Sequence, residues 1–180
     1  MDKRVNLAEH GKQLWTRDLA IAIRGEVEKV LMNAAPGDAV VIDAKDVEVF
    51  DYSFANELFG KTILRLANEY PEKFFVVENL TRYTRENLEN ALTSLGLAMI
   101  ERKGGELKLI GKIHPADQET FDAIADSKEP LTANTLKDKL KINLNAVNER
   151  LTKLTGLSLI RRKTGVSSAG RQQYEYTVLG

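Results

Sequence analysis

Residues 40–63 read VVIDAKDVEVFDYSFANELFGKTI, and this stretch predicts a strand, a loop and a helix in succession. The strand is predicted over 39–44, because a continuous apolar run without polar alternation is typical of a strand in the centre of a sheet. The helix is predicted over 51–70, where apolar residues recur at helical spacing. Either Asp51 or Ser53 can cap its first turn.

Further strands and helices alternate on both sides of this stretch. They are predicted as a strand at 4–8, a helix at 16–33, a strand at 74–79, a helix at 81–96, and two closing strands at 98–103 and 106–111. Such alternation is typical of an α/β fold in which helices cover a sheet. We therefore predict that residues 1–112 form one α/β sandwich domain, followed by a joint that contains Gly111 and Pro115.

The C-terminal third carries a helix-turn-helix pattern. After a helix predicted at 116–126, a short helix begins with Thr132 as its cap, and a second helix is predicted at 143–155. The second helix places four apolar residues on one side, where we expect them to be core: Leu144, Val147, Leu151 and Leu154.

A basic hairpin follows the second helix. Strands predicted at 158–163 and 172–179 flank a tip that is rich in glycine and serine. Tyr174, Tyr176 and Val178 alternate along the second strand and are expected on its buried face. Two helices joined by a turn and followed by a basic hairpin indicate a small α+β domain of the winged-helix type.

A winged helix over residues 113–180 points to DNA binding, and the local charge supports it. The whole chain is neutral, with 26 basic and 26 acidic residues, but residues 150–180 hold six basic side chains against one acid, and such a patch can neutralise phosphates. We expect bases or backbone to be contacted by Asn145, Glu149, Thr152 and Lys153, and phosphates to be held by Arg161, Arg162, Lys163 and Arg171. RNA binding by the same hairpin stays an alternative. A homodimer is expected, because one winged helix reads few base pairs.

The first domain resembles a known family. Residues 40–63 are similar to the central strand, switch loop and following helix of a STAS-like domain, the fold of anti-sigma-factor antagonists and of the cytoplasmic ends of sulfate transporters. The helix TRDLAIAIRGEVEKVL, at 16–31, fits the helix before that strand, and the motif Ser-Phe-Ala-x-Glu-Leu-Phe-Gly stands at 53–60. The resemblance covers about residues 3–110.

The resemblance implies a protein partner at the loop formed by Asp51, Tyr52, Ser53 and Asn56. In the antagonist branch, a Ser or Thr after the loop aspartate is phosphorylated by an ATP-binding kinase-like partner, and the added charge releases the complex. Here Tyr52 follows Asp51. Ser53 is then either a phosphate acceptor or a helix cap, and capping is favoured because serine caps are common. The alternative function is accordingly a partner-switching adaptor that does not bind DNA.

Several other classes of protein are disfavoured. Without cysteine the chain has no disulfide and no thiolate metal site, and its two histidines lie more than a hundred positions apart. Asp43, Asp46, Glu48 and Asp51 cluster after the central strand, but no phosphate-binding glycine loop and no nucleophile with a base accompany them. We expect no enzyme activity, no metal and no cofactor. No apolar run reaches membrane-spanning length and the first residues lack a signal-peptide pattern, so we expect a cytoplasmic transcription regulator.

Overall fold

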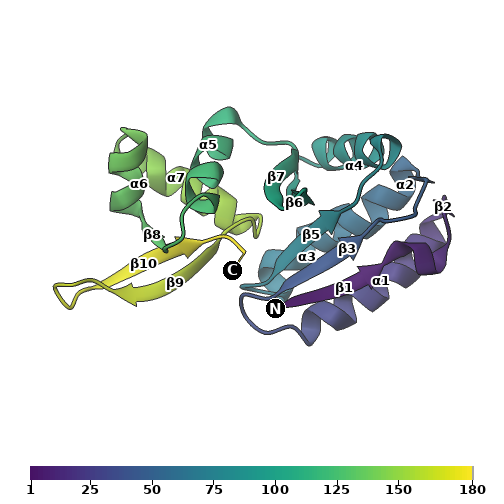
Figure 1. Ribbon diagram of the computed structural model, residues 1–180, viewed down its shortest axis with the longest axis horizontal. Coiled ribbons are helices and arrows are strands. Elements are labelled where there is room, and N and C mark those ends of the chain that lie inside the picture. The colour runs from purple at the N-terminus through teal and green to yellow at the C-terminus, as the bar shows by residue number, and fades with distance from the viewer. Residues whose placement is uncertain (180) are drawn as a thin grey trace.

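A five-stranded, mostly parallel sheet forms the centre of the computed structural model, which describes residues 1–179 (Figure 1). Its strands, in the order in which they lie side by side, are β1 (Asp2–Asn6), β3 (Ala39–Asp43), β5 (Phe74–Glu78), β6 (Ala98–Lys103) and β7 (Glu106–Gly111). The first four are parallel neighbours, and β7 returns antiparallel to β6. Gly104 and Gly105 take positive φ values of 60° and 85° in the tight turn between them, as glycine readily does.

Helices cover one face of this sheet. They are α1 (Arg17–Met32), α2 (Tyr52–Ala55), the π-helical turn η2 (Asn56–Gly60), α3 (Lys61–Glu69) and α4 (Arg82–Ser94). A short 3-10 helix, η1 (Leu7–His10), and the small parallel pair β2 (Gln13–Leu14) and β4 (Val49–Phe50) complete this part. Val40, Ile42 and Phe75 point from the sheet into the apolar cluster beneath the helices. The mixed α/β fold predicted from the sequence is therefore confirmed.

The opposite face is buried by the last third of the chain, which we call the C-terminal unit. It contains α5 (Pro115–Ala125), β8 (Leu131–Thr132), α6 (Ala133–Leu140), α7 (Leu144–Gly156), β9 (Arg161–Val166) and β10 (Gln172–Thr177). Its three strands form an antiparallel sheet in the order β8-β10-β9. Val41, Val76 and Ile100 of the large sheet join Phe121 and Leu154 of this unit in one apolar cluster. Because successive residues of β3 enter cores on opposite faces, the strand is apolar throughout.

The ends of the elements follow local signals in the sequence. Thr16, Thr81, Thr132 and Asn143 each cap a helix by accepting a hydrogen bond from a backbone N–H two or three residues into it. The helix predicted over 51–70 is interrupted by η2 and thus comes in three segments. No helix in the described part of the chain combines the length and the apolarity that a membrane crossing needs.

Candidate functional site

The outward side of α7 is polar, as predicted. Val147, Leu151 and Leu154 are buried, while Asn145, Glu149 and Thr152 on the other side are exposed. Asn148, which was not among the predicted contact residues, is also exposed beside them. The exposed side therefore offers two amides, a carboxylate and a hydroxyl, all of which can hydrogen-bond to base edges.

Leu144 is a correction, because it is 39% exposed rather than part of the core. It is the first residue of α7, directly after the Asn143 cap, whose side chain accepts a hydrogen bond from the Ala146 N–H at 2.8 Å. Helical side chains lean toward the helix N-terminus, so a residue in the first turn reaches beyond the end of the packed stripe.

Two basic residues of α7 are neutralised by α5. Lys153 Nζ lies 2.6 Å from Asp117 Oδ2, and Arg150 Nη1 lies 3.2 Å from Glu119 Oε2. Lys153 thus stands at the edge of the polar side with its charge already paired. The charges of Arg150 and Lys153 are therefore compensated within the C-terminal unit.

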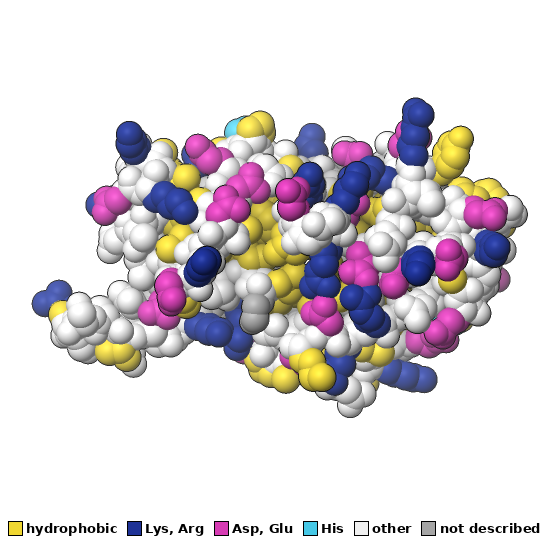
Figure 2. Space-filling model, in the orientation of Figure 1, with side chains coloured by type: hydrophobic (Ala, Val, Ile, Leu, Met, Phe, Trp, Pro, Cys, Tyr) yellow, Lys and Arg dark blue, Asp and Glu magenta, His cyan; other side chains and the backbone are white. Residues whose placement is uncertain are grey.

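Three of the four predicted phosphate ligands on the hairpin are exposed: Arg162, Lys163 and Arg171. Arg162 and Lys163 are adjacent in β9 and therefore point to opposite faces of the hairpin. Arg171 sits at the tip, which is closed by a hydrogen bond from the Ser167 N–H to the Arg171 carbonyl at 2.8 Å. In Figure 2 this hairpin projects from the body of the molecule with basic side chains along it.

Arg161 is separated from these three and lies against the large sheet domain, and we call it the docking arginine. Its Nε and Nη2 both lie 3.2 Å from Glu72 Oε1, and its side chain is only 17% exposed. Gly37 packs beneath it so closely that a Cβ there would come within 2.6 Å of Arg161 Nη1. The Gly37 N–H in turn donates to the Glu72 carbonyl at 2.7 Å, which fixes both partners of the docking arginine.

Tyr174 is a second correction, because it is 54% exposed rather than buried. Tyr176 and Val178 of the same alternating series are buried as predicted. The guanidinium of Arg162 lies over the Tyr174 ring, 4.5 Å from its centroid. This distance is that of a cation–π contact, so the two side chains hold each other in place.

The predicted partner loop is well ordered by its own hydrogen bonds. Asp51 caps α2, since its Oδ1 accepts from the Phe54 N–H at 2.7 Å. Ser53 is therefore a residue of the first turn and not the cap, which corrects the role we favoured for it. Tyr52 is exposed, and its hydroxyl lies 2.7 Å from Ser94 Oγ at the end of α4. Asn56, the last of the predicted loop residues, opens η2 and is half-buried.

Of the four carboxylates predicted to cluster after the central strand, Asp43 and Glu48 have separate partners and Asp51 caps α2. Asp43 Oδ1 accepts from Asn79 Nδ2 at 2.7 Å, and Asp43 Oδ2 lies 3.6 Å from Arg4 Nη1. Glu48 Oε2 accepts from Gln13 at 3.3 Å. Within residues 1–179, no group of three or more His, Asp or Glu side chains is arranged to hold a metal ion.

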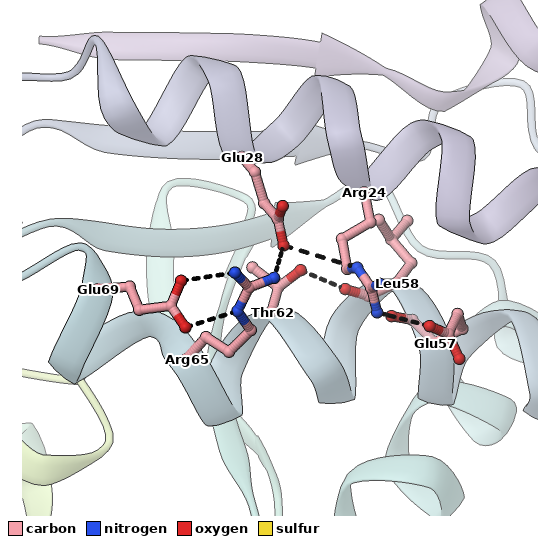
Figure 3. A network of polar contacts seen from close by, with 7 residues as sticks. All are labelled: Arg24, Glu28, Glu57, Leu58, Thr62, Arg65 and Glu69. Carbon is pink, nitrogen blue, oxygen red and sulfur yellow. Dashed lines mark hydrogen bonds and ion pairs between the residues drawn. The ribbon is translucent and has the colours of Figure 1, made fainter.

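A chain of ion pairs joins α1 to η2 and α3, and it was not predicted (Figure 3). Arg24 Nη1 lies 2.5 Å from Glu57 Oε1, and Arg65 pairs with Glu28 at 2.5 Å and with Glu69 at 2.6 Å. Glu57 is buried, because the π-helical turn directs it toward α1. The Arg–Glu pairs at a spacing of four were visible in the sequence, whereas the extra residue of a π turn has no such signal.

Comparison with known families finds a match that lies within the large sheet domain. Residues 20–84 match a STAS-like domain of unknown function (DUF4325). The matched region runs from α1 to the first turn of α4 and contains η2, the partner loop and most of the ion pairs. A STAS-like domain indicates a regulatory or partner-binding role. Among curated proteins, no relative of this chain is found.

Proposed function

We propose that this protein is a cytoplasmic transcription regulator, with a STAS-like domain at residues 1–112 that binds a signal or a protein partner, and a winged helix at residues 113–180 that binds DNA. The order of elements supports the second domain: three helices, a short strand between the first two, and a closing hairpin. The strand order β8-β10-β9 also suits a winged helix, because the hairpin then projects beside the last helix.

The observation that carries the proposal is the polar side of α7 beside three exposed cations. A B-form major groove is about 12 Å wide and admits one helix. With α7 in that groove, Asn145 and Thr152 meet base edges, and Glu149 can accept from the amino group of cytosine. Arg162, Lys163 and Arg171 then reach phosphates on the flanking backbone. A homodimer belongs to this proposal, since two such units read a longer site.

Selection from a random duplex library, followed by anisotropy titration of the enriched duplex at two salt concentrations, tests the proposal. We expect Asn145→Ala to weaken binding to the selected sequence by about 1–3 kcal/mol. Arg171→Ala should weaken selected and unrelated duplexes alike, because it removes a phosphate contact. Arg82→Ala, an exposed arginine of α4, is the matched control and should change neither. Absence of any salt-dependent duplex binding would reject the proposal.

The second candidate function is a partner-switching adaptor without DNA binding, engaged by an ATP-binding kinase-like protein. The exposed Tyr52 at the start of α2, inside the region that matches a STAS-like domain, favours it. Pull-down of a protein complex with Tyr52→Ala and Ser53→Ala separates the two candidates. The adaptor would be favoured if Tyr52→Ala or Ser53→Ala abolishes that complex while a variant without the exposed hairpin cations still forms it.

A further inference from the structure

We infer that the outer half of the hairpin is a stacking site for an unpaired nucleobase, centred on Tyr174. This inference rests on the proposed nucleic-acid-binding function and adds a ligand class to it. The first observation is the contrast between two tyrosines on one face of β10. Tyr176 is 7% exposed and packs on the core of the C-terminal unit, whereas Tyr174, two residues nearer the tip, is 54% exposed. Tyr174 is therefore an aromatic side chain of β10 with much of its surface open to a ligand.

The second observation is what surrounds that ring. Thr164 lies directly opposite Tyr174 in the strand register, and Gln172 precedes it by two residues on the same face. Arg162 lies diagonally across with its guanidinium over the ring. The strands leave a shallow hollow of about 260 Å³ here, lined by Thr164, Gln172, Gln173 and Tyr174. An aromatic face, a guanidinium plane, a hydroxyl and an amide thus meet on one side of the hairpin.

These groups match the chemistry of a nucleobase. Bases stack on tyrosine rings and on arginine planes, and hydroxyl and amide groups can hydrogen-bond to their edges. The attached phosphate is negative, and the hairpin carries three exposed basic side chains, Arg162, Lys163 and Arg171, against a single acid, Glu175, so the charge is complementary. A neutral apolar partner would leave Arg162 and Gln172 without hydrogen bonds, which makes it the poorer occupant.

The base has to be unpaired. In a continuous duplex both faces of each base pair are covered by neighbouring pairs, so a tyrosine ring reaches a base face only in single strands, loops or ends. The groove-reading side of α7 and the stacking face of the hairpin consequently recognise two different features. One nucleic acid could present both where a duplex is followed by a loop or an open region.

A tryptophan in place of Tyr174 makes the site directly observable. Trp15 is the sole tryptophan of the chain, so the double variant Trp15→Phe/Tyr174→Trp reports from the hairpin alone. Titration with an oligothymidine of about 12 nucleotides, and with an oligouridine of the same length, should quench its fluorescence. The two arms show whether the preferred strand is DNA or RNA. An unquenched indole at saturation would overturn the inference.

Affinity measurements on the wild-type background complete the test. Tyr174→Ala should weaken binding of the single strand by about 5- to 150-fold, the range that corresponds to loss of one stacked base. Tyr174→Phe should bind as the wild type does, because the ring is kept. Tyr83→Ala is the control, since Tyr83 of α4 is 66% exposed and far from the hairpin in sequence.

The results separate this inference from the proposed function. If Tyr174→Ala binds single strands as well as the wild type does while duplex binding stays dependent on α7, the stacking site is wrong and the regulator stands. If neither single strands nor duplexes bind, both fail. Loss of single-strand binding in Tyr174→Ala with duplex binding retained supports the stacking site.

Discussion

The four basic residues of the hairpin should contribute unequally to the salt dependence of DNA binding. Each phosphate contact releases counterions and steepens the slope of log K against log salt by about 0.9 for B-form DNA. Lys163 is exposed, so Lys163→Ala should lower the slope by about 0.9. The docking arginine is already paired with Glu72 at 3.2 Å and is 17% exposed, so Arg161→Gln should leave the slope unchanged. When the salt is raised from 50 to 200 mM, a variant that lacks one phosphate contact should therefore lose about 3.5-fold less affinity than the wild type does.

Anisotropy titration of a labelled duplex at four salt concentrations measures these slopes. Each variant removes one positive charge from β9, and Arg161→Gln retains a hydrogen-bond donor toward Glu72. Circular dichroism should first show that both variants are folded. An equal loss of slope in both variants would mean that the docking arginine leaves Glu72 to meet phosphate, and the reasoning from its pairing would be refuted.

Three further predictions concern stability. Gly37→Ala should destabilise the protein by about 1–3 kcal/mol in urea unfolding, because residue 37 has a φ of +89° and faces the docking arginine. The control is Gly25→Ala in an open part of α1, which should leave stability unchanged or raise it by about 1 kcal/mol. Glu57→Gln should lower the free energy of unfolding by about 1–2 kcal/mol, because it removes the charge that pairs with Arg24. In a double-mutant cycle with Arg24→Ala the two effects should be coupled, and purely additive effects would contradict this prediction. Burial holds the pKa of the Tyr176 phenol above its usual value of 10.0, so this group loses its proton in the unfolded chain at a lower pH than in the folded protein. The free energy of unfolding should therefore fall as the pH rises past about 10, and it should fall less steeply in Tyr176→Phe.

Apolar periodicity predicted the elements well where burial alone decides them. The stripes of α1 and α7 and the continuous run of β3 are each selected by a core that spans the whole element. Where a helix or strand extends beyond the elements that pack on it, the same patterns predicted burial for residues that are exposed. Leu144 precedes the packed turns of α7, and Tyr174 lies on β10 beyond the helices that bury Tyr176. Periodicity gives the face of a residue but not the length of the neighbour that covers it.

Long-range polar partners were the other part that could not be predicted. The sequence predicts the docking arginine as a phosphate ligand, because it lies next to Arg162 and Lys163. Its partner Glu72 is 89 residues away and is brought near only by packing of the C-terminal unit on the sheet. Likewise, the sequence allows either Asp51 or Ser53 to cap α2, and capping was the favoured role for Ser53. The helix begins at Tyr52, so Asp51 is the cap.

The fold places the predicted partner loop and the C-terminal unit toward opposite ends of the large, mostly parallel sheet. The loop that contains Tyr52 follows the carboxyl ends of the strands, while the C-terminal unit packs on residues near their amino ends, such as Ala39 and Phe74. From the loop, η2 and α3 run back along the helical face, and the turn after α3 carries Glu72, which holds the docking arginine. The ion pairs of Figure 3 fasten this path to α1 along its length. If the proposed partner binds the loop and the proposed nucleic acid binds the C-terminal unit, coupling between them requires a partner that favours one arrangement of the C-terminal unit over another. The contact between Glu72 and the docking arginine, which joins that unit to the turn after α3, is the contact at which we expect such a change to act.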